Sequence, residues 1–278
     1  MPKNKAMSQT EYLLDVREKY IRKSNDLIQK SRFSLSIQEQ KIILFLISKI
    51  KPEDEDFKTY TFSIAEFCQV CGIERSGKEQ KIIKDEIKQI ADQSMWVETA
   101  PGKEILLRWI NDPGIDTNTG VITVEFSRNM RPYLLQLKER YTEYQLIYSI
   151  QFKSKYALRL YEWICSIHYN VFKPYTYTLT VDELKKRIGA ENYAAFKNFK
   201  QRALIPAIKE INEYSDKLID IEYLEGYGKG RPVKAIKFKV QTKPRTDLDR
   251  IRADIDRRMK VDYQYSIWQQ MEKIENER

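Results

Sequence analysis

A short sequence pattern occurs twice in this chain and constrains its fold more than any other feature. Residues 60–72 align without gaps on residues 177–189. Each copy begins with β-prone residues, continues with a hydroxyl residue followed three positions later by glutamate, and ends at a glycine. This combination starts a helix with a capping box and ends it at a residue that tolerates positive φ. The cap pairs are Ser63 with Glu66 and Thr180 with Glu183, and the glycines are Gly72 and Gly189.

The segments around the two copies are also alike. Apolar residues at helical spacing predict one helix before each copy and a longer one after it, and alternating apolar residues then predict strands. The helices are expected at 37–49, 78–93, 154–169 and 193–214, and the strands at 95–98, 104–110, 121–126, 218–223 and 233–240. These elements predict an α+β protein with two winged-helix domains, each a helix-turn-helix plus a β-hairpin, in tandem. The alternative is two unrelated α+β domains that are alike by chance.

The positive charge of the chain is concentrated in the second unit. The formal net charge is +9, from 49 basic and 40 acidic residues. Residues 151–240 carry 17 basic and 10 acidic side chains, whereas residues 33–150 carry 15 basic and 18 acidic ones. A concentrated positive potential is typical of a protein that binds a polyanion such as DNA. On charge alone, a solvated basic face is the alternative.

The long helix predicted at 193–214 has a polar face suited to the major groove of DNA. Arginine can donate two bonds to guanine, asparagine or glutamine can pair with adenine, and Ile205 can contact a thymine methyl group. Pro206 lacks an amide hydrogen and should kink or restart this helix. Lys200 falls toward the core side and would have to extend outward to reach a phosphate. The predicted DNA-binding residues are Lys197, Asn198, Lys200, Gln201, Arg202 and Lys209 on the helix, Lys153 and Lys155 before it, and Lys229, Arg231 and Lys234 in the wing.

The first unit differs in the two places that matter for binding. Its long helix mixes acidic residues with Lys78, Lys81 and Lys84, so these lysines are expected to contact phosphates and not bases. Its hairpin is more apolar than burial of one face requires, which predicts a dimer interface. The interface residues are expected to be Ile105, Leu107 and Trp109. A fully buried strand is the alternative.

Motifs for catalysis are incomplete, so we expect no enzyme, no cofactor and no metal. The single histidine, His168, excludes a rolling-circle nicking mechanism that needs two metal-binding histidines. Residues 72–78 imitate a phosphate-binding loop, but Glu79 replaces the hydroxyl that should hold Mg²⁺. Cys68 and Cys71 lack a second pair for zinc and are expected to be buried as small apolar residues.

The apolar pattern predicts a cytoplasmic protein. The longest apolar run, residues 42–47, is far shorter than the roughly 20 residues that span a bilayer. No charged start with an apolar stretch resembles a signal peptide. Three cysteines in a cytoplasmic chain predict reduced thiols.

Several segments resemble the plasmid replication initiator proteins, which bind directly repeated origin sequences, called iterons, through tandem winged helices. The resemblance lies in residues 35–43, 130–135, 153–161 and 199–204, followed by Glu210-Ile-Asn212, and extends from about residue 24 to 240. It implies that the second unit contacts a repeat in the major groove, with Lys200, Gln201 and Arg202 at the recognition segment. It also implies that the first unit contacts the neighbouring backbone or pairs subunits, with the hairpin at 105–109 in the dimer sheet.

Together these features predict a plasmid DNA replication initiator that binds direct repeats at the origin, helps to open it and recruits host replication proteins. The resemblance implies that monomers initiate and dimers repress the gene, so the expected partners are double-stranded DNA, a second copy, and the host helicase and initiator proteins. The alternative is a winged-helix transcription regulator without a replication role. The expected segments are an N-terminal arm (1–31), winged helix 1 (32–150, dimerisation and backbone contacts), winged helix 2 (151–243, sequence-specific DNA contacts) and a charged helical tail (244–278).

Overall fold

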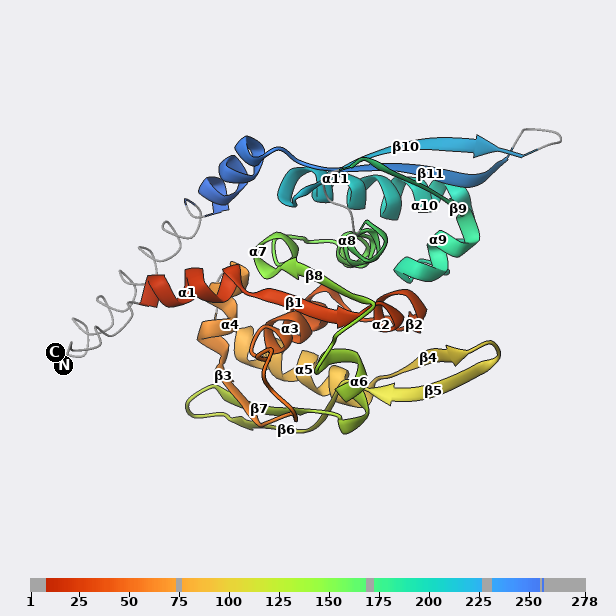
Figure 1. Ribbon diagram of the computed structural model, residues 1–278. Coiled ribbons are helices and arrows are strands. Elements are labelled where there is room, and N and C mark those ends of the chain that lie inside the picture. Colours follow the sequence, from red (N-terminus) through yellow and green to blue (C-terminus); the bar gives the residue numbers. More distant parts are fainter. Residues whose placement is uncertain (1–8, 74–76, 169–172, 227–231, 256, 258–278) are drawn as a thin grey trace.

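The computed structural model describes residues 9–73, 77–168, 173–226, 232–255 and 257. Figure 1 shows two bodies stacked one above the other, with α7 (Leu146–Ser149), α8 (Lys155–Ile167) and β8 (Tyr141–Gln145) between them. The lower body is built mainly from the first half of the chain and the upper body from the second half. None of the helices in the described ranges has the length and apolar character that a bilayer crossing requires.

The lower body contains the first winged helix. Its three helices are α3 (Ile37–Ile47), α4 (Ile64–Cys71) and α5 (Glu79–Asp92), and β3 (Tyr60–Ser63) precedes α4. Two hairpins follow, β4 (Ser94–Ala100) with β5 (Lys103–Arg108) and β6 (Ile110–Asp116) with β7 (Val121–Phe126). A short 3₁₀ turn (Arg128–Met130) and α6 (Arg131–Leu134) lead to β8. The first hairpin pairs with β2 (Ser31–Arg32) and the second with β3, giving two three-stranded sheets.

The upper body contains the second winged helix. After α8 come β9 (Tyr175–Thr180), α9 (Val181–Ile188), α10 (Phe196–Phe199) and α11 (Ile205–Tyr214), and then the hairpin of β10 (Lys217–Glu225) and β11 (Val233–Thr242). Strand β11 lies between β10 and β9 in one antiparallel sheet. The predicted α+β fold with two winged helices in tandem is therefore confirmed.

The two repeats begin their helices differently. Thr180 and Glu183 form the predicted capping box, with each side chain bonded to the backbone of the other. Ser63 accepts from the amide of Glu66, but the Glu66 carboxylate is used elsewhere: it accepts from the Tyr12 hydroxyl at 2.6 Å and from the Lys49 ammonium at 2.8 Å. The capping box predicted there is thus only half formed, because tertiary partners take the carboxylate.

Both repeats end as predicted. Gly72 has φ +62° and Gly189 has φ +71°, the left-handed conformation that lets the chain leave the helix at once. Residues 74–76, inside the loop that imitates a phosphate-binding motif, lie outside the described residues.

Pro206 restarts the long helix of the second unit, one of the two predicted outcomes, and the restart follows a π-helical turn. This turn spans Lys200–Leu204, and the amide of Ile205 donates to the carbonyl of Lys200. Proline cannot donate an amide hydrogen to the carbonyl four residues earlier, and its ring crowds that carbonyl. A wider turn just before Pro206 relieves the crowding, and α11 continues from Ile205 with the proline in its first turn.

Residues 9–31 of the expected N-terminal arm are structured. They form α1 (Gln9–Glu18), β1 (Tyr20–Ser24), α2 (Asn25–Lys30) and the start of β2 (Ser31–Arg32). Strand β1 pairs with β8, which lies more than a hundred residues later in the chain, and Ile21 and Leu27 are buried. The sequence prediction missed these strands because each is too short to show a period of its own.

The described start of the charged tail is also docked. Residues 245–255 are helical, and Ile255 is buried. The Arg252 guanidinium donates to both oxygens of Glu18 at 3.0 Å. This helix is therefore joined to the last residue of α1.

Buried polar contacts join the two bodies along α8. The Lys23 ammonium on β1 lies 2.5 Å from the Glu162 carboxylate on α8, and the Tyr144 hydroxyl on β8 donates to the same oxygen. Arg159, also on α8, donates to the carbonyls of Ser31 and Arg187. Burial lowers the pKa of Lys23, while the adjacent carboxylate opposes that shift.

Candidate nucleic-acid interface

The third helix of the second unit separates apolar from polar side chains. Phe199, Ala203, Leu204 and Ala207 are fully buried against the domain. The opposite face is exposed, because the apolar positions repeat at helical spacing through the π turn. The predicted base-contacting residues lie on this exposed face: Lys197, Asn198, Gln201, Arg202, Ile205 and Lys209.

Lys200 has the intermediate position that its spacing predicted. It is half-buried, and its ammonium lies 4.2 Å from the centre of the Tyr223 ring on β10. A cation over an aromatic face is stabilised by the ring quadrupole. The ring therefore holds the ammonium between the helix and the hairpin.

The start of α8 is fixed to α11 by a carboxylate. The backbone amides of Lys153 and Ser154 donate to Glu210 at 2.8 and 3.1 Å, so the loop before α8 follows the long helix. The Lys153 side chain is exposed, and Lys155 is half-buried with its ammonium 5.4 Å from the Tyr156 ring. Both predicted lysines thus lie beside the third helix.

The wing is described only at its base. Lys229 and Arg231 lie outside the described residues, whereas Lys234 is exposed on β11. Farther along the hairpin, Lys237 and Lys239 lie 3.8 and 3.7 Å from Glu222. Lys234 is thus the predicted wing residue that the structure places on the surface.

The third helix of the first unit carries mixed charge, as the sequence indicates. Lys78, Lys81 and Lys84 are exposed. Lys88 pairs with Asp92 at 3.4 Å, and Glu86 accepts from the Ser36 hydroxyl at 2.7 Å. Part of the charge of this helix is therefore paired within the chain, and Lys78, Lys81 and Lys84 remain exposed.

The β4–β5 hairpin requires a correction to the expected dimer interface. Leu107 and Trp109 are each only 2% exposed and point into the core, while Ile105 is 40% exposed. The exposed apolar side chains beside Ile105 are instead Trp96 and Leu106, which face each other across the two strands. The apolar run at 105–110 does not by itself separate core-facing from exposed positions, because that separation depends on the strand paired with it. The alternation of side chains along the paired strands β4 and β5 could have placed Trp96 and Leu106 together on the exposed face.

The histidine and cysteine side chains that could take part in catalysis or metal binding are packed into the fold. His168 is buried, its Nε2 lies 2.9 Å from the Lys173 carbonyl oxygen, and its ring stacks on Tyr175. Cys68 and Cys71 are buried, as predicted, and burial raises the pKa of the Cys71 thiol to about 12. Within the described ranges, no group of three or more histidine, cysteine or carboxylate side chains is arranged to hold a metal ion.

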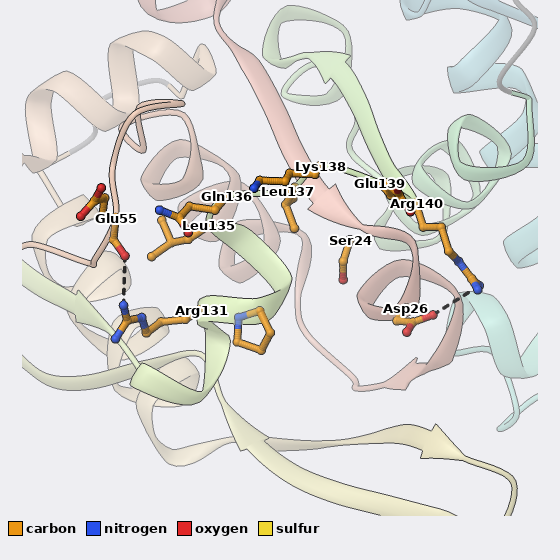
Figure 2. Close-up of a pocket in the computed structure, with 11 residues that line it drawn as sticks. Ser24, Asp26, Glu55, Arg131, Leu135, Gln136, Leu137, Lys138, Glu139 and Arg140 are labelled. Carbon is orange, nitrogen blue, oxygen red and sulfur yellow. Dashed lines mark hydrogen bonds and ion pairs between the residues drawn. The ribbon is translucent and has the colours of Figure 1, made fainter.

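A hollow of about 640 Å³ lies beside the loop that follows α6, and Figure 2 shows the residues that line it. Its charged side chains are largely satisfied by neighbours. Arg131 donates to the Glu55 carbonyl at 3.0 Å, and Arg140 lies 3.8 Å from Asp26. This hollow therefore offers mixed, paired charge and no concentrated site for an anion.

The fold and the exposed polar helix define a tandem winged-helix protein. Two family models match the chain: Initiator Replication protein, WH1, over residues 20–165, and Initiator Rep protein, WH2, over residues 180–240. The matches cover most of the sequence. The chain therefore belongs to the family of initiator replication proteins, as its sequence resemblance implied.

Individual relatives agree with this assignment. A replication initiation protein of Escherichia coli is 26% identical over 234 residues, which cover 81% of this chain and 71% of that protein. The PI protein of Escherichia coli is 28% identical over 148 residues, 48% of this chain and 47% of that protein. The solved structure of the Pi initiator protein in complex with iteron DNA superposes with a TM-score of 0.68 at 20% identity, covering 82% of this chain and 98% of that one. This structure supports the fold.

Proposed function

We propose that this initiator starts replication of a plasmid by binding direct repeats at the origin, helping to open the DNA there and recruiting host replication proteins. The observation that carries the proposal is the exposed face of α10 to α11, with Asn198, Gln201 and Arg202 on a complete winged helix. The similar Pi initiator protein was solved with iteron DNA, which supports the same ligand here. The protein acts in the cytoplasm without catalysis of its own, and opening depends on the host helicase and initiator proteins.

The two units divide this task. The second winged helix contacts bases, because its third helix offers amide and guanidinium groups that match base edges. The first contacts backbone phosphates through Lys78, Lys81 and Lys84, and phosphate contacts distinguish one sequence from another poorly.

A footprint on the plasmid that carries the gene tests the proposal: protection should cover directly repeated sequence near the gene. A footprint that covers no repeated sequence would contradict the proposal. Replication that persists after deletion of the gene would favour the alternative function, a transcription regulator.

A second copy of the chain is the proposed partner of the β4–β5 hairpin. Its outer face exposes Trp96 and Leu106, which are directly paired across the two strands, whereas Ile105 is exposed on the opposite face, the one that carries Leu107. An exposed apolar cluster of this kind marks a protein interface. The dimer formed there represses the gene, and the monomer initiates replication.

Arg202→Ala should weaken binding to the cognate repeat by about 1–3 kcal/mol and relax preference at one base position. The arginine is exposed in the π turn and can donate two parallel bonds to a guanine. Fluorescence anisotropy with the repeat and with each single-base variant measures both effects. Arg202→Lys is the matched control, since it keeps the charge but lacks the bidentate fork. An Arg202→Lys protein that discriminates bases as well as the wild type would contradict the assignment.

Lys234→Ala should weaken cognate and random duplexes alike. The lysine is exposed at the base of the wing, where a phosphate contact adds affinity without sequence preference. The slope of log K against log salt concentration should become shallower by about one. A loss confined to the cognate repeat would instead show that Lys234 contacts a base.

A further inference from the structure

A second basic site lies where the two winged helices meet. A hollow of about 410 Å³ there is lined by Arg32 on β2, Lys155 at the start of α8 and Lys186 on α9, together with Glu191 and Asn192 from the turn before α10. Three cations thus surround one carboxylate. Arg32 and Lys186 are exposed and Lys155 is half-buried, and no ion pair to any of the three is found among the described residues. Lys155 also interacts electrostatically with the Glu39 carboxylate, so the excess positive charge of the hollow comes mainly from Arg32 and Lys186, and it favours an anionic ligand.

The two exposed cations are held at a fixed separation by a buried arginine. Arg159 donates to the Ser31 carbonyl at 3.2 Å and to the Arg187 carbonyl at 3.0 Å, and these residues are the immediate neighbours of Arg32 and Lys186. Its guanidinium also stacks 4.1 Å from the centre of the Phe33 ring. At the boundary between the two bodies, a Cβ added at Gly189 would lie 3.5 Å from the Phe33 carbonyl oxygen. The backbone after α9 and the backbone after β2 therefore approach each other closely. The backbone segments that carry Arg32 and Lys186 are therefore joined by a buried side chain.

The hollow lies between the third helices of the two units. On one side, the turn that contains Glu191 and Asn192 leads directly into α10. On the other side, the segment after β2 reaches Ser36, whose hydroxyl donates to Glu86 on α5. Figure 1 shows β2 and α9 on the same side of the molecule, where this seam opens. With the third helix of the second unit in a major groove and that of the first unit on the neighbouring backbone, the DNA strand between these two contacts passes the hollow.

We propose that Arg32, Lys155 and Lys186 bind a backbone phosphate of the DNA segment that connects the contacts of the two winged helices. Arginine supplies a planar fork that fits phosphate oxygens, and lysine supplies point charge. The three cations outnumber the single carboxylate, Glu191, so the site keeps a net positive charge. Glu191 repels a phosphate and so favours positions nearer the cations. Arg159 is a positioning residue, because it fixes the two cations without reaching the surface. The inference rests on the proposed function and adds to it a contact that sets the spacing between the two units on DNA.

The test is a salt titration of the double variant Arg32→Gln/Lys186→Gln on a direct-repeat duplex and on random duplex. The slope of log K against log salt concentration should become shallower by about one, and affinity near physiological salt should fall roughly three- to tenfold on both duplexes. The control Lys51→Gln/Arg245→Gln removes the same charge from exposed positions outside the hollow. It should leave the slope close to that of the wild type. Equal slopes for the double variant and the control would overturn the inference.

A duplex with one neutral methylphosphonate linkage locates the contact. Moving this linkage through the segment between the contacts of the two winged helices should weaken the wild type at one position and leave the double variant unaffected there. Inorganic phosphate, titrated by calorimetry, separates a free-anion site from a DNA contact. Micromolar phosphate binding that the double variant loses, without any change in its DNA salt slope, would also overturn the inference. A wild type that binds random and repeat duplexes equally would refute the proposed function, and the slope on random duplex would still test the hollow.

Discussion

Glu162→Gln should lower the free energy of unfolding by about 3–5 kcal/mol. The Glu162 side chain is 3% exposed, and its partner Lys23 is 5% exposed, so the substitution leaves a buried ammonium without a counter-charge. Arg159, a second buried cation on α8, lies near the same carboxylate and lowers the pKa of Lys23. Because Lys23 belongs to β1 and Glu162 to α8, the loss also weakens the seam between the two bodies. Urea denaturation followed by circular dichroism measures the change.

The matched control is Glu143→Gln. Glu143 pairs with Arg22, the residue next to Lys23 on the same strand, but those side chains are 33% and 38% exposed. Water and salt screen an exposed pair, so its loss should cost about 1 kcal/mol or less. If both substitutions destabilised the protein equally, burial would not be the cause of the effect.

Trp109→Ala should destabilise the fold by about 3–5 kcal/mol while leaving the dimer surface in place. The Trp109 ring is 2% exposed, meets Phe33 edge-on at 5.6 Å and has the Lys23 ammonium 5.8 Å from its centre. Removing it opens a cavity in the core of the first unit. The midpoint of thermal unfolding, measured at low protein concentration, should fall accordingly.

Trp96→Ala is the counterpart on the outer face of the same hairpin. Trp96 is 50% exposed, so its truncation should change monomer stability by less than about 1 kcal/mol. Self-association, measured by analytical ultracentrifugation, should weaken at least tenfold if the aromatic ring is an anchor of the dimer. Undiminished dimerisation of Trp96→Ala would remove the hairpin face from the proposed interface.

The third helix of the second unit shows which features of the candidate site could be predicted from the sequence. The apolar positions from Phe199 to Ile211 fix which side faces the core, so the exposed positions of Gln201 and Arg202 followed from spacing alone. The π turn did not follow from it. Pro206 signals a disturbed hydrogen-bond pattern, but whether the backbone kinks or widens depends on the packing around it.

The repeated pattern at residues 60–72 and 177–189 determined by itself that the chain folds as two winged helices. Helix caps, glycines that end helices and apolar periodicity act over a few residues, so they can be recognised in the sequence without knowledge of the rest of the molecule. Only the tertiary structure decided which face of the β4–β5 hairpin is free and that Arg32 meets Lys186 across the seam. Those outcomes depend on residues that lie far apart in the chain and come together only when β1 pairs with β8 and α8 packs between the two bodies.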